Sequence, residues 1–516
     1  MPEMENLRGV VGAGSSHEPI RSRYSPWMAR AALPTIGISV ALMVAVGVLG
    51  PSAAVARFPP APPWPPWFIH AQLSSALAAI ITWMAVLIGG TGLALGLLAA
   101  RRGWRPPVRR VIAGSVLAVL VLMVIPPTGS ADMLLYSAYG RIAALGHNPY
   151  TYLPEQLRLS GDPVGTVAGL GYLNDPPRYG PVAIVTEEAA SRLAGDSVAR
   201  TIFWLKVWNG LAYLALVLSL DRLLREDESR RIRAHLLWSL NPLMLWAVMA
   251  GGHVDGLAIG VGAAAMFAMR RVDSRRALLA GILLGLASAV KAPIALLGAG
   301  LAWAARRSSL TLAALGIGAA VVTIPCYFLA GRASIVAVLG TAKLQQVDYV
   351  PWYVLTRALH WHDPTTKINA LGLISFVLLG LILLRSMPSG PSDFPAVRVA
   401  LAVVLAWLIV SPQQRSWYDA MIYPLLVLMP ATRLDWIVVI RSVAGALGDL
   451  PTLVYRSELH PAWLSKTGRI AAVGIVPLTL TAVGVVLLWL CYTNDWRGVA
   501  NPDHRDTRDE IVATGQ

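Results

Sequence analysis

Apolar runs that approach the length of a transmembrane helix recur along the whole sequence. The 516 residues are 56% hydrophobic and only 14% charged, and their mean hydropathy is +0.58. Ordinary soluble domains do not have this composition. Because a bilayer-crossing helix needs about 20 mainly apolar residues, we expect an all-α polytopic membrane protein with about 12–14 transmembrane helices. The predicted spans are 31–50, 73–100, 111–125, 202–220, 235–250, 256–269, 277–290, 311–330, 368–384, 397–410, 421–428 and 470–490, with shorter candidates at 293–305 and 434–447.

Basic residues gather in the short connections between these spans. The net charge of +15 would also suit a nucleic-acid-binding protein. However, connections rich in arginine are typical of the cytoplasmic side of membrane proteins. We therefore expect no nucleic-acid partner and assign these connections to the cytoplasm. The arginines concerned are Arg21, Arg23, Arg30, Arg101, Arg102, Arg105, Arg109, Arg110, Arg222, Arg225, Arg230, Arg231, Arg233, Arg270, Arg271, Arg275, Arg276, Arg306 and Arg307.

The connections on the opposite side carry most of the reactive side chains. This distribution predicts an extracytoplasmic active site on a multi-pass membrane protein. We expect one transmembrane domain over 29–493, a disordered cytoplasmic N-terminus at 1–28 and a cytoplasmic tail at 494–516. The two cysteines, Cys326 and Cys491, lie in or at the end of apolar runs and are expected to pack as small side chains rather than form a disulfide.

One polar segment stands out directly after the predicted span 111–125. Ionisable side chains beside lipid are costly and usually have a function. We expect an amphipathic helix over 133–145, lying on the membrane surface in the first large external loop. Asp132 has two interpretations here: a reactive carboxylate, or an ordinary N-cap of that helix. The polar residues of the segment are Asp132, Tyr136, Arg141, His147 and Tyr150.

Further polar residues lie at the predicted external ends of later spans. One pair precedes a short helix predicted at 182–193, and a helix N-terminus is a natural anion site. Another pair lies in a Gly-Gly turn and is either an ordinary polar turn or a substrate contact. Lys291 either snorkels to the interface or meets a lipid phosphate. These residues are Arg178, Tyr179, His253, Asp255, Lys291, Arg415 and Tyr418.

The run His360-Trp361-His362-Asp363 resembles a metal site only weakly. Two histidines that are two residues apart do not share a helical face, as metal ligands on one helix would. We therefore expect neither a metal nor another cofactor.

Taken together, the polar motifs resemble those of bacterial GT-C glycosyltransferases that use polyprenyl-phosphate sugars. They are most similar to those of actinobacterial polyprenyl-phosphomannose-dependent mannosyltransferases. Each motif is short, but their order and their common side of the membrane make the likeness fairly specific. The motifs are Asp132 with Tyr136 and Gly140, Gly146 with Pro149-Tyr150, Tyr179-Gly180-Pro181, Asn241-Pro242-Leu243, Gly251-Gly252-His253, Val290-Lys291 and Trp417-Tyr418.

This resemblance implies a fold and a reaction. The fold would be a GT-C-type helical bundle. The enzyme would move a sugar from a polyprenyl phosphate in the outer leaflet to a cell-envelope glycan or glycolipid. The likeness to mannosyltransferases implies that this sugar is mannose. The family carries a general-base aspartate in its first external loop, and Asp132 occupies that place.

The residue types agree with such a transfer. The reaction needs a base for the acceptor hydroxyl, which Asp132 can provide, and cations for the leaving phosphate. We expect Lys291 and Arg415 to bind the phosphate, with Arg178 or His253 in support. A single base with in-line attack would invert the anomeric centre. Expected substrate-binding residues are Tyr136, Arg141, His147, Tyr150, Tyr179, Asp255 and Tyr418.

Two other functions remain open at this point. A polyprenyl-phosphate pentosyl (arabinofuranosyl) transferase would have the same architecture. A lipid or sugar transporter would also have many spans, but it would place ionisable groups near the midplane and show internal repeats. The sequence has its polar groups at one face and no visible repeat, which disfavours the transporter.

Overall fold

The computed structural model describes residues 26–56, 64–65, 71, 73–167, 173–340, 350–361, 364–449 and 461–496. Of the residues in these ranges, 76% are helical. The only strand-like pairing in these ranges is an isolated bridge between Ser52 and Val55. This confirms the predicted all-α class.

The helices follow one another with short connections. Their bounds are α1 (Pro26–Val48), α2 (Ser75–Arg101), α3 (Val108–Val124), α4 (Asp132–Ala144), α5 (Pro154–Leu159), η1 (Gly165–Val167), α6 (Pro181–Ala194), α7 (Val198–Leu223), α8 (Glu228–Ala234), η3 (His235–Ser239), α9 (Pro242–Met244), η4 (Leu245–Ala250), α10 (Asp255–Ala268), α11 (Ser274–Val290), η5 (Ala292–Leu296), α12 (Leu297–Ala305), α13 (Ser309–Ala330), α14 (Arg332–Gly340), α15 (Pro351–Ala358), α16 (Pro364–Ser386), α17 (Val397–Val410), η7 (Ser416–Met421), α18 (Tyr423–Leu428), α19 (Leu434–Asp449), α20 (Ala462–Ile470), η10 (Ala471–Ile475) and α21 (Val476–Thr493).

Six helical segments among the described residues are long and apolar enough to cross a membrane, which confirms a polytopic membrane protein. The expected 12–14 spans are not all present as long helices. Several predicted spans are shorter than 18 residues, such as α3 and α11 with 17 each and α18 with 6. Pro242 is the first residue of α9, inside the predicted span 235–250, and Pro424 is the second residue of α18, inside the predicted span 421–428; proline is favoured at these first positions of a helix. The six long segments are Pro26–Val48, Ser75–Arg101, Val198–Leu223, Ser309–Ala330, Thr366–Ser386 and Ala462–Thr493.

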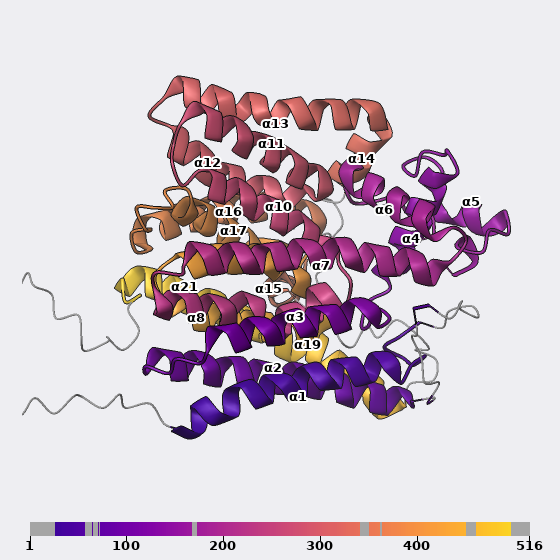
Figure 1. Cartoon of the computed structure of the whole chain (residues 1–516), viewed down its shortest axis with the longest axis horizontal. Coiled ribbons are helices and arrows are strands. Elements are labelled where there is room, and N and C mark those ends of the chain that lie inside the picture. Colours follow the sequence, from indigo (N-terminus) through magenta and orange to yellow (C-terminus); the bar gives the residue numbers. More distant parts are fainter. Residues whose placement is uncertain are drawn as a thin grey trace, which may run out of the picture.

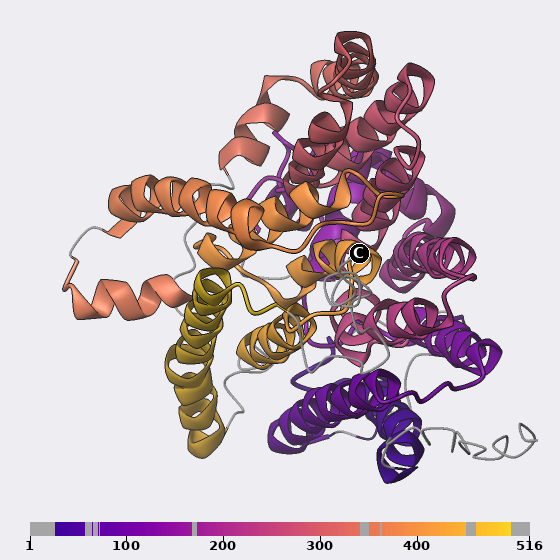
Figure 2. The ribbon, with the colours of Figure 1, turned by 90° about the vertical axis from the view of Figure 1, so that its left-hand side faces the viewer.

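The long helices run roughly side by side in one bundle (Figure 1). Helices α4 and α5 lie together at the right-hand end in this view, whereas α8 and the start of α1 lie toward the left. The end-on view in Figure 2 separates α1 and α2 at the bottom from α11 and α13 at the top. The lipid-facing character of α13 is plain from its side chains, because Phe328 and Leu329 are 83% and 84% exposed although both are apolar.

Some predictions fall partly or wholly outside the described residues. The predicted N-terminus 1–28 and tail 494–516 lie outside them, except that 26–28 begin α1 and 494–496 follow α21. His362 and Asp363 of the possible metal run also lie outside the described ranges. The single-domain assignment over 29–493 stays a prediction.

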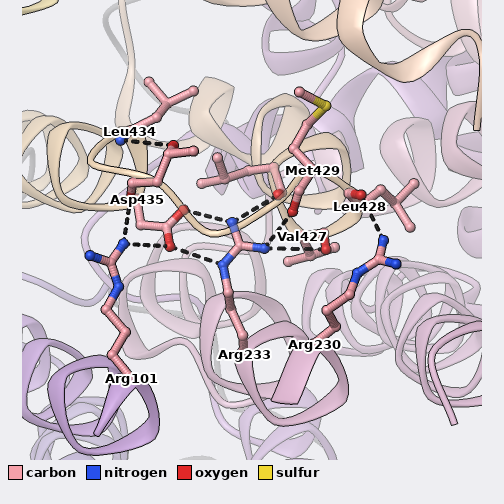
Figure 3. A network of polar contacts seen from close by, with 10 residues as sticks. Arg101, Arg230, Arg233, Val427, Leu428, Met429, Leu434 and Asp435 are labelled. Atoms are coloured by element: carbon pink, nitrogen blue, oxygen red, sulfur yellow. Dashed lines mark hydrogen bonds and ion pairs between the residues drawn. The ribbon is translucent and has the colours of Figure 1, made fainter. Parts of the chain in front are cut away.

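An arginine network fastens several helices at the end of the bundle where α8 lies (Figure 3). The Arg233 guanidinium is buried and binds both carboxylate oxygens of Asp435, at 2.9 and 2.6 Å. It also donates to the carbonyls of Leu426 and Met429 at the end of α18, and Arg101 from α2 reaches the same Asp435 at 3.1 Å. The network therefore ties α2, α8, α18 and α19 together through one buried carboxylate.

We expect Arg233→Leu to destabilise the protein strongly. Removing one partner of a buried ion pair typically costs about 3–5 kcal/mol, because the other charge stays buried. Arg230→Leu is a matched control, since Arg230 is half-buried and donates only to the Leu428 carbonyl at 2.8 Å within the drawn network. Thermal unfolding in detergent should show a large loss for the first variant and a small one for the second. Equal losses would contradict the role given to the network.

Candidate functional site

Two glycines bring the Gly-Gly turn and α4 into contact. Gly252 has φ +73°, which disfavours any other residue. A Cβ at this position would lie 2.4 Å from Met133 Cε, so the turn packs directly on α4. A Cβ on Gly251 would lie 3.0–3.1 Å from the imidazole of His253. The absence of both side chains therefore lets His253 approach the first turn of α4.

Asp132 lies at the start of α4 but does not cap it. The N-cap position is Ala131, with no side-chain cap hydrogen bond. The Asp132 carboxylate instead meets two other groups: its Oδ2 atom lies 3.3 Å from His253 Nδ1 and accepts a hydrogen bond from the Tyr136 hydroxyl at 3.3 Å. Both contacts fall on Oδ2, and the Asp132 side chain is 25% exposed. The capping interpretation is therefore wrong, and Oδ1 is the oxygen that takes part in neither contact.

A pair of tyrosines extends this contact. The hydroxyl oxygens of Tyr136 and Tyr179 are 2.7 Å apart. Since the single Tyr136 proton goes to Asp132, the Tyr179 hydroxyl is the donor in this second bond. Burial is the main reason that the pKa of both phenols is raised, so both keep their protons. The chain Tyr179, Tyr136, Asp132 therefore holds one carboxylate oxygen in place.

The surroundings of Asp132 keep it ionised. Burial by itself would raise the pKa of this carboxyl, but the contact with His253 and the positive charges of His253, Arg415 and Lys291 lower it to about 2. Asp132 is therefore an anion at every pH where a bacterial enzyme works. The charges of Lys291 and Arg415, two of the predicted phosphate-binding cations, act on the Asp132 carboxylate. Both cations therefore lie near Asp132.

Lys291 is held inside the protein rather than at its surface. Its ammonium group is 2.6 Å from Asp255 Oδ1, and both side chains are almost fully buried. The ammonium also lies over the rings of Tyr418 and Tyr179, at 4.2 and 5.8 Å from their centroids, where cation–π attraction holds it. Snorkelling to the interface is therefore not its role.

A backbone contact explains why Tyr179 is close to Lys291. The Gly180 N–H donates to the Val290 carbonyl at 3.0 Å. A Cβ on Gly180 would lie 2.2 Å from the Ala289 carbonyl oxygen, so only glycine permits this approach. The start of α6 is thereby fixed against the end of α11.

Arg415 comes from the turn before η7. Its guanidinium pairs with Asp449 of α19 at 3.2 Å and lies 5.7 Å from the ring centroid of Trp417. The other oxygen of Asp449 accepts the Ser416 N–H at 2.8 Å. Asp449 thus orients the turn that carries Arg415, Trp417 and Tyr418.

Other predicted residues lie apart from this cluster or only border it. Arg141 pairs with Asp162 and Asp196 in the external loops, at 2.8 and 2.6 Å. His147 stacks on Tyr152, with ring centroids 4.4 Å apart. The substrate-binding roles of Arg141 and His147 stay predictions.

Tyr150 and Arg178 border the cluster. The Tyr150 hydroxyl donates to the Tyr179 carbonyl at 2.8 Å, so Tyr150 supports Tyr179 from behind. Arg178 pairs with Asp175 at 2.9 Å. Tyr179 thus lies in the cluster, and the hydrogen bond from Tyr150 holds its backbone there.

The setting of α4 differs from the prediction. The expected helix lies on the membrane surface, whereas Met133–Gly140 and Ile142 are all buried. Helices α5, α6 and α7 pack against it, and Gly140 permits contact with the backbone of Glu187 in α6. Helices α5, α6 and α7 therefore cover α4 instead of leaving it open.

Lys291, Arg415 and Arg178 each form an ion pair with an aspartate that was not predicted as their partner. Asp449 and Asp175 were missed altogether, and Asp255 was expected to bind substrate rather than Lys291. Trp417 was likewise not expected to touch His253, on whose ring it stacks. Within the described ranges, no three His, Cys, Asp or Glu side chains gather as a metal site; independence from metal stays a prediction.

We expect Gly252→Ala to separate Asp132 from His253. The new Cβ would collide with Met133, and the positive φ adds strain. Gly146→Ala is a matched control, because Gly146 has φ +86° with nothing within 4 Å of the added Cβ; it should cost only the strain of about 1 kcal/mol. Thermal unfolding of the two variants measures the difference, and equal losses would contradict the packing described for the turn.

Comparison with known proteins gives relatives with one activity. The chain is 26% identical over 247 residues to a probable alpha-(1->6)-mannopyranosyltransferase of Mycolicibacterium smegmatis, covering 47% of this chain and 44% of the relative. It is 26% identical over 160 residues to an alpha-(1->6)-mannopyranosyltransferase of Mycobacterium tuberculosis, covering 30% and 26%. It is 24% identical over 256 residues to alpha-(1->6)-mannopyranosyltransferase B of Corynebacterium glutamicum, covering 48% and 41%. The chain therefore spans less than half the length of these curated relatives.

A family model matches a larger part of the chain. The model describes the N-terminal domain of alpha-(1->6)-mannopyranosyltransferases, and it matches residues 34–307. This range is more than half of the chain, and it includes Asp132, Tyr179, His253 and Lys291 but not the turn with Arg415 and Trp417. The chain therefore belongs to the alpha-(1->6)-mannopyranosyltransferase family that this N-terminal domain defines.

Proposed function

We propose that the protein is an inverting membrane mannosyltransferase. It takes mannose from a polyprenyl-phosphate donor and transfers it to a cell-envelope glycan or glycolipid on the extracytoplasmic face. Family membership supports the transferase class. The observation that carries the proposal is the ionised Asp132, oriented through Oδ2 by Tyr136 and His253, in the field of Lys291 and Arg415.

The reaction follows from this arrangement. The acceptor hydroxyl oxygen bonds to the anomeric carbon of the mannosyl group from the side opposite the phosphate. The bond from that carbon to the phosphate oxygen breaks, and its electrons leave with the polyprenyl phosphate. Asp132 Oδ1 takes the hydroxyl proton, because Oδ2 already has two partners. A β-linked donor then gives an α-linked product.

A base with a pKa near 2 is weak in the ground state, and this suits a late proton transfer. The acceptor hydroxyl becomes a strong acid only as its oxygen bonds to the anomeric carbon. The low pKa of Asp132 therefore implies that no activity loss between pH 5 and 8 arises from this group.

The phosphate would be bound by cations that are already oriented. Asp255 accepts one of the three N–H donors of Lys291, and Asp449 accepts one contact from the five-donor guanidinium of Arg415. Because each positive charge is balanced in advance, the site suits a singly charged phosphodiester better than a diphosphate. Charge develops on the phosphate as it leaves, and prearranged donors stabilise that charge.

The proposal is tested directly by incubating purified protein with radiolabelled polyprenyl-phosphate mannose and membrane acceptors. Transfer of label to the acceptor supports it. The corresponding arabinofuranosyl donor serves as the comparison, and preferential transfer of arabinose would replace the mannose assignment. Absence of transfer from both donors would overturn the proposal.

We expect Asp132→Asn to lower turnover by about 10²–10⁴-fold in this assay, because the amide cannot take the proton. Donor affinity and thermal stability should change little. Asp196→Asn is the control, since Asp196 is an external aspartate whose side chain is 70% exposed. A fully active Asp132→Asn enzyme would eliminate Asp132 as the base.

We expect the double change Lys291→Met with Asp255→Asn to lower turnover by about 10²–10³-fold, as for other losses of one prearranged donor. Changing both residues avoids leaving Asp255 as a buried unpaired charge. The fold should therefore survive, which thermal unfolding in detergent checks. Unchanged turnover in a folded double variant would remove Lys291 from phosphate binding.

The extracytoplasmic location needs its own test. In a variant without Cys326 and Cys491, single cysteines replace Leu159 in α5 and Arg271 after α10. Both positions are exposed, Leu159 at 72%. We expect an impermeant thiol reagent added to intact cells to label position 159 but not position 271. The reverse labelling would place the site in the cytoplasm.

A further inference from the structure

The imidazole of His253 is held between groups from distant parts of the chain. Its ring stacks on Trp417, with centroids 3.5 Å apart and planes 14° from parallel. Its Nδ1 atom faces Asp132 Oδ2 at 3.3 Å. The side chain of His253 is only 2% exposed. One face of the ring and its reactive edge are therefore both in contact with protein.

Trp417 is itself anchored from several sides. The Ser416 N–H binds Asp449 at 2.8 Å, on the residue before it. Two residues after it, Asp419 pairs with Arg441 and accepts the Ser442 hydroxyl at 2.6 Å. Buried ion pairs of this kind resist displacement, because separating them would leave charges unpaired. The indole is thus a fixed surface against which the imidazole lies.

We propose that Trp417 is a positioning residue, which holds the His253 ring so that it contacts Asp132 Oδ2 and leaves Oδ1 for the acceptor. This inference rests on the proposed function and extends it to a residue that does not touch the reacting atoms. Loss of the indole should therefore disturb the orientation of the His253 ring.

Other charged and titratable side chains lie around the contact between His253 and Trp417. They come from α4, the loop before α6, the start of α10, the end of α11 and the turn before η7. None of them replaces the indole on the ring face. They are Asp132, Tyr136, Tyr179, Asp255, Lys291 and Arg415.

The test is a double-mutant cycle with mannosyl transfer as its readout. Trp417→Leu should lower kcat about tenfold or more with little change in KM, and Trp417→Phe should restore much of the activity. In a His253→Gln background, Trp417→Leu should change kcat by less than about threefold, because the two residues act as a unit. Multiplying effects of the two changes would overturn the proposal.

Trp407→Leu is the matched control. Trp407 is a half-buried tryptophan 5.7 Å from the ring centroid of Tyr418 and is not part of the stack on His253. Trp417→Leu should lower kcat about tenfold or more, whereas Trp407→Leu should change kcat by less than about threefold. Equal losses in both variants, or no loss in either, would refute the proposal.

A measurement without turnover separates this inference from the proposed function. Contact with the His253 ring should quench the Trp417 indole, so His253→Gln should raise tryptophan fluorescence in the wild-type background but not in the Trp417→Phe background. If the wild type transfers no sugar but this difference is seen, the proposed function fails and the contact stands. If His253→Gln changes the fluorescence equally in both backgrounds, the positioning role is wrong.

Discussion

Burial of charge is the constraint on which the structure depends. A cation enclosed by apolar helices is stable only with an opposite charge or polar groups beside it. Four buried or largely buried cations each have an aspartate from another part of the chain. Arg233 and Arg441 join helices in this way, while Lys291 and Arg415 become part of the site. The same physical requirement therefore builds both the scaffold and the charged groups around Asp132.

Asp132 differs from those aspartates because its partners are weaker and lie on one oxygen. Tyr136 donates a neutral hydrogen bond, and His253 approaches at 3.3 Å. The carboxylate is oriented but not neutralised by a permanent cation. This distinction is what makes it suitable to receive a proton, whereas Asp255 and Asp449 are committed to Lys291 and Arg415.

Much of this site was predictable from residue types and positions along the chain. The apolar runs predicted the helical class, and the polar residues at their ends include Asp132, His253, Lys291 and Tyr418, which lie in one cluster although they are far apart in sequence. The number of long spans and the open setting of α4 were less well predicted, because several spans are shorter than 18 residues and α5, α6 and α7 pack against α4. Such packing of one segment on another cannot be read from local composition.

The sequence by itself determined the membrane class and the separation of arginine-rich connections from those that carry the candidate reactive residues. These follow from local composition, which any fold of the chain must satisfy. Only the tertiary structure decided which charges pair and which oxygen of Asp132 contacts Tyr136 and His253. Such contacts depend on close approach between segments, as at Gly252 on Met133 and His253 on Trp417. No spacing along the chain specifies them, because the partners come from helices that meet only in the folded protein.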